Sequence, residues 1–194
     1  MSAPEKDFSK NYVGELVSML PRLDFAAIEK AISWLKAAGA EGRTIFSCGN
    51  GGSASIASQM AVDMVKGASM ASGTRYRMIA LTDSIATITA YANDVNYDAV
   101  FVEPLKNFAA RGDVLIAISG SGNSANVLRA VEYANAAGLK TIGLTTATGG
   151  RLKDLAQLPI LVPTDHMGRL EDAFFLVTHV LCYACMGKPQ PKGE

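Results

Sequence analysis

The first forty residues carry apolar side chains at helical spacing. One series lies between residues 8 and 20, and a second repeats the spacing between 24 and 38. The first series consists of Phe8, Tyr12, Val13, Leu16 and Leu20. Because a helix completes a turn every 3.6 residues, positions three or four apart share one face. The pattern predicts two amphipathic helices before the first strand.

Further along, short continuous apolar runs alternate with helical patterns. The runs cover residues 45–48, 78–81, 114–118, 140–145 and 158–162. The helical patterns cover about 53–66, 84–92, 98–110, 125–137 and 169–186, with Ser53 as the expected N-cap of the first. Apolar strands separated by helices are typical of a parallel sheet covered on both faces. We expect an α/β fold with about five parallel strands flanked by helices.

Two segments depart from simple periodicity. Residues 67–75 are small and polar, which predicts an exposed connection. The last helix is apolar on nearly every face, and we expect it to be buried, with a second subunit as the simplest partner.

Composition narrows the class of protein. The 194 residues are 49% hydrophobic, enough for one well-buried domain, so we expect a single domain over 1–194. Eighteen basic residues balance eighteen acidic ones, which argues against nucleic acid or an anionic membrane as partner. The chain shows neither a signal-peptide pattern nor a membrane-spanning run, and its three cysteines fit a reducing compartment, so we expect a cytoplasmic protein. Cys182 and Cys185 lie in an apolar stretch and are interpreted as small buried side chains rather than a metal site.

Two Ser/Gly loops each follow an apolar strand and precede a helix. The first reads GNGGS at 49–53 and the second SGSGNS at 119–124. One such loop could be an ordinary turn, but two in matching positions favour anion binding, because small residues let backbone N–H groups approach an anion at a helix N-terminus. Parallel sheets bind ligands at the carboxyl ends of their strands, where both loops lie.

The nature of the anion follows from what the loops lack. The first loop has no Lys-Ser/Thr ending of a nucleotide P-loop, and no acidic residue closes an adjacent strand as in a dinucleotide site. We therefore expect a phosphate monoester on a small molecule, with no organic cofactor.

The last helix offers a candidate acid/base pair. Glu171 and His179 are spaced two turns apart on one face. A lone histidine on an apolar helix can equally be a core residue, and His166 is interpreted as a solvated loop residue, with a metal ligand as the alternative. A phosphate site with a carboxylate and an imidazole suits the movement of a carbonyl between C1 and C2 of a sugar phosphate.

The order of motifs resembles the SIS (sugar isomerase) family, and within it the bacterial phosphoheptose isomerases. The resemblance covers about residues 10–188. It rests on GNGGSA at 49–54, TDSIATITAYAND at 82–94, GDVLIAIS at 112–119, SGNSANV at 121–127, Gly149-Gly150 and HVLC at 179–182. It implies a three-layer flavodoxin-like fold with a helical oligomerisation segment at 1–40 and an α/β core at 41–188. It also implies a homotetramer with sites between subunits and the buried C-terminal helix in the interface.

Site residues follow from the resemblance position by position. The substrate-binding set is Asn50, Gly51, Gly52, Ser53, Asn93, Asp94, Ser119, Gly120, Ser121, Ser124 and Glu171. Gly120 stands where the family usually has threonine. The family's metal-binding histidine and its glutamate, which is both ligand and base, are replaced by Gln59 and Asp63. Glu171 replaces a glutamine ligand, and His179 is retained.

The resemblance implies an aldose–ketose isomerase that converts sedoheptulose 7-phosphate to D-glycero-D-manno-heptose 7-phosphate through an enediol, for lipopolysaccharide or capsule precursors. Asp63 would be the base and His179 would serve the oxygens. Zinc is the implied metal, with Gln59, Asp63, Glu171 and His179 as ligands, although the replacement of one histidine weakens that set. Two alternatives stay open: an isomerase of another sugar phosphate, and a non-catalytic sugar-phosphate-binding protein.

Overall fold

The structure is a computed structural model that describes residues 7–187. Five parallel strands form its centre. They are β1 (Thr44–Cys48), β2 (Arg77–Ala80), β3 (Val114–Ile118), β4 (Lys140–Thr146) and β5 (Leu158–Val162). The sheet order is β2-β1-β3-β4-β5, and every pair is parallel. The predicted flavodoxin-like α/β fold is thereby confirmed. The ends of the predicted domain, 1–6 and 188–194, lie outside the described residues.

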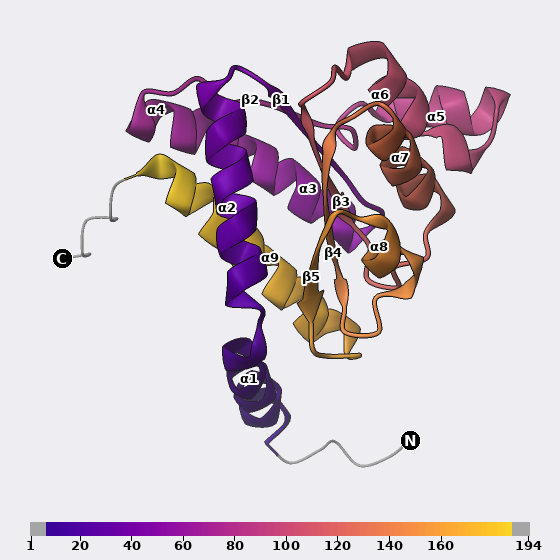
Figure 1. Ribbon diagram of the computed structural model, residues 1–194. Coiled ribbons are helices and arrows are strands. Elements are labelled where there is room, and N and C mark those ends of the chain that lie inside the picture. Colours follow the sequence, from indigo (N-terminus) through magenta and orange to yellow (C-terminus); the bar gives the residue numbers. More distant parts are fainter. Residues whose placement is uncertain (1–6, 188–194) are drawn as a thin grey trace.

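Helices cover both faces of the sheet (Figure 1). On one face lie α2 (Phe25–Ala40), α3 (Gly52–Val62) and α9 (Met167–Met186), with α4 (Ser69–Ser72) at their end. On the other lie α5 (Ile85–Asp94), α6 (Val102–Phe108), α7 (Ala125–Ala136) and α8 (Gly150–Leu155). The first helix, α1 (Phe8–Met19), projects beyond the sheet and continues through a 3₁₀ turn, η1 (Leu20–Arg22).

Alternate residues of the strands feed two separate cores. Ile45, Val114 and Ile116 face α2, α3 and α9 in one buried cluster. Phe46 and Leu115 face the opposite side, where α6, α7 and α8 close a second cluster. Strands buried on both faces must be apolar at every position, which explains the continuous runs in the sequence.

The segment after β1 differs from the prediction. The helix begins at Gly52 with Gly51 as N-cap, not at Ser53, because Gly51 adopts a φ of 55° that only glycine adopts readily. Helical structure then continues past residue 66, through a π-helix, η2 (Asp63–Ala68), into α4. The predicted exposed connection over 67–75 was therefore wrong up to Ser72.

Other boundaries also moved. The helix predicted over 98–110 is divided into a 3₁₀ turn, η3 (Tyr97–Ala99), and α6. The Gly149-Gly150 turn opens a helix, α8, that the sequence pattern did not indicate. Asp24 and Ser84 cap α2 and α5 by accepting hydrogen bonds from Ala27 N and Thr87 N.

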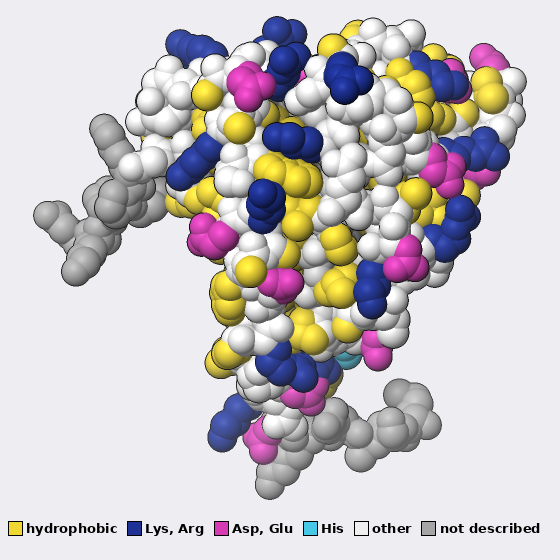
Figure 2. All heavy atoms as spheres, viewed as in Figure 1, with side chains coloured by type: hydrophobic (Ala, Val, Ile, Leu, Met, Phe, Trp, Pro, Cys, Tyr) yellow, Lys and Arg dark blue, Asp and Glu magenta, His cyan; other side chains and the backbone are white. Residues whose placement is uncertain are grey.

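The prediction for the last helix holds for one side only. Eight residues of α9 are buried inside the chain, whereas Leu176, Val180 and Tyr183 remain exposed. Figure 2 shows further hydrophobic side chains along the side that carries α2 and α1, with basic and acidic groups interspersed. Within residues 7–187, none of the helices has the length and hydropathy needed to cross a membrane.

Candidate functional site

The two Ser/Gly loops lie side by side at the carboxyl edge of the sheet. They follow β1 and β3, which are neighbours, with Cys48 opposite Ala117 in the pairing. The helix after β1 covers one face and the helix after β3 covers the other, so the chain winds in opposite directions from this point. Doubly wound proteins bind ligands at such a switch point, outside the carboxyl ends of the strands.

The second loop is shaped by close backbone contact with the turn before α8. Gly122 has a φ of 65°, and a Cβ there would lie 1.9 Å from the carbonyl oxygen of Gly149. Leu152 N donates to Gly122 O at 2.9 Å, and Arg151 N donates to Asn123 Oδ1 at 3.0 Å. The Gly149-Gly150 motif therefore acts as a support for the second loop.

Hydroxyl groups of the second loop face one another. Ser119 Oγ and Ser124 Oγ are 3.2 Å apart, while Ser121 Oγ accepts a hydrogen bond from Asn123 N at 3.2 Å. Ser124 is also the N-cap residue of α7, and its side chain makes no capping bond. These hydroxyls and the free N–H groups of the first turn of α7 are the donors that a phosphate group needs. At Gly120 a side chain would press on Met167 and Leu170 of α9, at about 3.1 and 3.3 Å.

An asparagine pair joins the two loops, and the sequence analysis missed it. Asn50 Nδ2 donates to Asn126 Oδ1 and Asn126 Nδ2 donates to Asn50 Oδ1, each at 2.9 Å. Tyr97 OH donates to Asn50 Oδ1 at 3.0 Å. Asn126 is nearly fully buried. No local sequence pattern indicates this pair, because the two residues are 76 positions apart.

Asp63 and His179 are brought together by α3, η2 and α9. His179 Nε2 is 3.5 Å from Asp63 Oδ2, and Gln59 Nε2 donates to Asp63 Oδ1 at 3.3 Å. Asp63 Oδ2 is buried and has no hydrogen-bond partner within residues 7–187. Asp63 begins the π-helix, a feature often found at functional sites. One carboxylate oxygen is thus fixed and the other is aimed at an imidazole that is about half exposed.

Glu171 occupies a different part of the site. Its carboxylate packs against the first loop, where a Cβ on Gly52 would lie 2.2 Å from Glu171 Oε1. Gly52 opens α3, so this carboxylate lies at the positive end of that helix. The absence of a side chain at position 52 is what leaves room for it.

The four positions predicted as zinc ligands do not form a ligand set. No three His, Cys, Asp or Glu side chains among residues 7–187 converge as they would around a metal ion. Asp63 and His179 approach each other and the Gln59 amide donates its N–H to Asp63, whereas the Glu171 carboxylate packs against the first loop. Catalytic zinc takes three protein ligands, so this donor set does not fit zinc.

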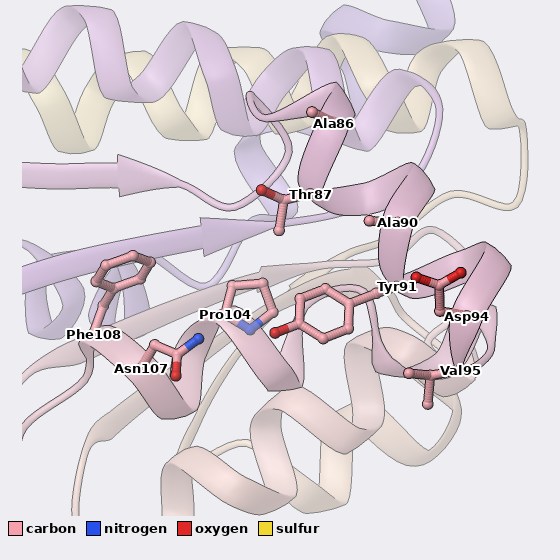
Figure 3. Close-up of a pocket in the computed structure, with 9 residues that line it drawn as sticks. All are labelled: Ala86, Thr87, Ala90, Tyr91, Asp94, Val95, Pro104, Asn107 and Phe108. Carbon is pink, nitrogen blue, oxygen red and sulfur yellow. The ribbon is translucent and has the colours of Figure 1, made fainter.

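Asn93 and Asp94 end α5, on the sheet face that carries α7. Asn93 Nδ2 donates to Asp94 Oδ1 at 2.7 Å, and both residues are exposed. Asp94 borders a cavity of about 680 Å³ between α5 and α6. Figure 3 shows Tyr91 reaching from α5 toward Pro104 and Asn107 of α6 across this space. None of the residues that line this cavity comes from the Ser/Gly loops.

The remaining candidate groups have structural roles. His166 is exposed, as expected of a solvated residue, and it is also the N-cap of α9. Its Nδ1 accepts a hydrogen bond from Arg169 N at 3.4 Å. Cys48, Cys182 and Cys185 are free and buried, as the sequence predicted for the CxxC pair. Burial raises the pKa of the Cys48 thiol to about 12 and raises that of Cys182 further.

Fold and site define a class of doubly wound protein with Ser/Gly loops at the switch point and a carboxylate–imidazole pair where η2 meets α9. The sequence profile of the SIS domain matches residues 10–146, more than half of the chain. The chain therefore belongs to the SIS domain family.

Relatives within that family are similar over most of their length. A phosphoheptose isomerase of Nitratiruptor sp. is 41% identical over 140 residues, 72% of this chain and 74% of the relative. One from Rhodospirillum rubrum is 37% identical over 156 residues, 80% of this chain and 82% of the relative. The solved structure of a phosphoheptose isomerase from Francisella tularensis superposes with a TM-score of 0.88 at 28% identity, covering 96% of this chain and all of that one. The predicted resemblance is confirmed.

Proposed function

We propose that the protein is an aldose–ketose isomerase that converts sedoheptulose 7-phosphate to a heptose 7-phosphate. The observation that carries the proposal is the Asp63–His179 pair, 3.5 Å apart, in a chain that also carries the two Ser/Gly loops and is 41% identical over 140 residues to a phosphoheptose isomerase. Isomerisation needs one group for a carbon-bound proton and a second for the oxygens, and this pair supplies both.

The first half of the reaction uses the unpartnered oxygen of Asp63. The carboxylate takes a proton from C1 of the ketose, and the C–H electron pair forms the C1=C2 bond. The electrons of the C2 carbonyl move to O2, which receives a proton from the His179 imidazolium. The product is a cis-enediol, with one proton on Asp63 and a neutral imidazole.

The second half returns both groups to their starting states. His179 takes the proton from O1, the C1 carbonyl forms, and the electron pair of the double bond takes the Asp63 proton at C2. Gln59 keeps the base oriented by donating to its other oxygen. The sugar's phosphate is assigned to the loop of Ser119, Ser121 and Ser124, whose hydroxyls and backbone N–H groups are suitable donors.

This mechanism uses the two side chains directly and routes no step through a metal. Asp63 replaces a longer glutamate in the family pattern, so its carboxylate lies about one methylene, roughly 1.5 Å, further back. Displacement by roughly 1 Å can cost about a hundredfold in rate. The approach of His179 to Asp63 Oδ2, and the hydrogen bond from Gln59, support a pair that retains acid/base function.

The assembly we propose is a homotetramer with sites near subunit contacts, in the cytoplasm, where heptose precursors of lipopolysaccharide or capsule are made. Apolar residues left exposed on α1 (Phe8, Val13 and Val17) and on α9 (Leu176, Val180 and Tyr183) support burial against other copies. Three free thiols support a reducing compartment.

The test is turnover in deuterated buffer. Purified, metal-analysed protein is mixed with sedoheptulose 7-phosphate, and NMR follows aldose formation and deuterium at C2 of the aldose and C1 of the recovered ketose, with and without added zinc. Asp63→Asn and His179→Ala should lose turnover by several orders of magnitude while the sugar phosphate still binds. Asp154→Asn and His166→Ala serve as controls, because they change the same residue types outside the pair. Both should keep normal turnover.

Two other results would each favour a different function. Label incorporation with another ketose phosphate, and little with sedoheptulose 7-phosphate, would identify an isomerase of a different substrate. Binding without turnover or label, unaffected by Asp63→Asn, would identify a sugar-phosphate-binding protein.

A further inference from the structure

We propose that Asn126, together with Tyr97, is a positioning residue that fixes the first Ser/Gly loop against the second. The inference rests on the proposed function for its kinetic consequences, but its structural basis is independent of the substrate. Asn126 lies at the second position of α7, directly after the second loop, and contacts Asn50 at the tip of the first.

The side chain of Asn50 is largely occupied by this contact. Its Oδ1 accepts from both Asn126 Nδ2 and Tyr97 OH, and its Nδ2 donates to Asn126 Oδ1. An asparagine amide offers two N–H donors and one oxygen with two lone pairs. Only one N–H is left for a ligand. Asn50 therefore serves the site mainly by holding the loop.

Asn126 is suited to this task by its position. It is 2% exposed, and its Oδ1 also accepts from Val127 N at 2.9 Å, which satisfies a free N–H of the first helical turn. The side chain is thus fixed to α7 at one side and to Asn50 at the other. On the first loop, Ser53 N donates to Asn50 O at 3.0 Å, so the position of Asn50 sets the turn that opens α3.

The consequence is a defined separation between the two loops. A ligand held by both loops requires their donors at fixed mutual distances, and the amide pair is the direct polar link from one loop tip to the helix of the other. Loss of the link should leave each loop formed but free to shift relative to its partner. A displacement of the substrate by roughly 1 Å can lower the catalytic rate about a hundredfold.

The experiment compares Asn126→Asp with Asn135→Asp. Both substitutions keep the shape and replace an amide donor, and Asn135, nine residues along the same helix, also makes three hydrogen bonds, to Leu155 O, Thr141 Oγ1 and Gln157 Nε2. Asn126→Asp should raise the Kd for sedoheptulose 7-phosphate on the order of tenfold and lower kcat/KM about a hundredfold. Asn135→Asp should lower the melting temperature but leave Kd and kcat/KM of the folded protein unchanged.

Tyr97→Phe provides a milder variant, because Tyr97 is exposed and the change removes a single hydrogen bond. It should fold normally and raise Kd severalfold. Amide hydrogen exchange over residues 49–53 in the ligand-free protein gives a readout that needs no substrate: exchange should accelerate in Asn126→Asp and in Tyr97→Phe, but not in Asn135→Asp.

The outcomes separate this inference from the proposed function. Failure of the unmodified protein to turn over sedoheptulose 7-phosphate would count against the function, while faster loop exchange would still support the positioning role. Equal exchange over 49–53 in Asn126→Asp and Asn135→Asp, or unchanged binding in both Asn126→Asp and Tyr97→Phe, would overturn it.

Discussion

At Asp63 the two carboxylate oxygens have different environments. Oδ1 is held by the amide of Gln59, and Oδ2 is buried without a hydrogen-bond partner among the described residues, 3.5 Å from His179 Nε2. A buried acceptor without a donor is costly in a folded protein, which makes Oδ2 the atom to test. Position 59, one helical turn before Asp63, is where a third ligand can be introduced.

Gln59→His should create a zinc site. The new imidazole would stand one helical turn before Asp63 and raise the ligands near Oδ2 from two to three, the number that catalytic zinc uses. We expect zinc affinity at least about tenfold above that of the unmodified protein. Isothermal titration with zinc measures it, with Val62→His, an exposed position on the same helix, as the control. Equal zinc affinity in the two variants would contradict this geometry.

Gly122→Ala tests the contact that shapes the second loop. The new Cβ would meet the carbonyl oxygen of Gly149 at 1.9 Å, in addition to the cost of a φ of 65°. Gly73→Ala has a similar φ of 77° with open space around it, so it isolates the backbone cost of about 1–2 kcal/mol. We expect Gly122→Ala to cost about 2–5 kcal/mol in denaturant unfolding. An equal decrease in the free energy of unfolding for the two variants would mean that the turn before α8 moves to accommodate the new Cβ.

At the scale of elements, the strands were predictable and the helices after them less so. Strands 114–118 and 158–162 were predicted with the bounds that the structure has, because each is a continuous apolar run with a polar residue directly before it. The π-helix at Asp63 was not, since its residues give the same periodicity as an α-helix over a single turn. The start of α8 was not predicted, because the pair Gly149-Gly150 is typical of a turn. In the structure both glycines have positive φ angles and open the helix.

The site also has parts that the sequence predicts locally and parts that depend on contacts between distant residues. Both Ser/Gly loops could be located from sequence because local residue types define them. The pairing of Asp63 with His179 came from the family resemblance, and the Asn50–Asn126 link joins residues 76 positions apart, so no local pattern indicates it. Contacts of this kind depend on how α3, α7 and α9 are oriented across the sheet.

Cys48 lies at the end of the buried strand β1, and its burial predicts a poorly reactive thiol. Desolvation raises the pKa of Cys48 from 9.0 to about 12, so at pH 8 its thiolate fraction is about a thousandfold lower than that of an ordinary thiol. Alkylation by iodoacetamide should be undetectable at Cys48 in the native protein and rapid in denaturant, by mass spectrometry. Ser33→Cys, exposed on α2, should label quickly in both states. Rapid native labelling of Cys48 would show that β1 opens to solvent.

At the scale of the whole molecule, the chain leaves apolar parts of its helices uncovered. No residue of α5 is buried within the chain, and α1 presents Phe8, Val13 and Val17 to the outside. α1 is held to α9 by polar contacts, with Tyr12 OH donating to Asp172 Oδ2 at 2.7 Å and Arg169 paired with Glu15. These contacts orient the apolar face of α1 without covering it, so that face is where the proposed contact with another copy can be tested.

The double variant Val13→Glu/Val17→Glu should therefore break the assembly. The two positions lie one helical turn apart on α1, and each glutamate would bury a charge in the proposed contact, a substitution that protein interfaces tolerate poorly. Size-exclusion chromatography with light scattering should show smaller species than the unmodified protein, with far-UV circular dichroism unchanged. Asn11→Glu, also exposed on α1, should leave the mass unaltered.

The activity of the separated subunits then distinguishes two roles for the contact. If sites are completed between copies, turnover falls with the mass and recovers as protein concentration is raised, because association follows mass action. If each subunit carries a complete site, turnover per chain stays constant across concentration while the mass changes. An unmodified protein that is monomeric at micromolar concentration would contradict the assembly itself, since the exposed apolar residues of α1 and α9 would then face solvent.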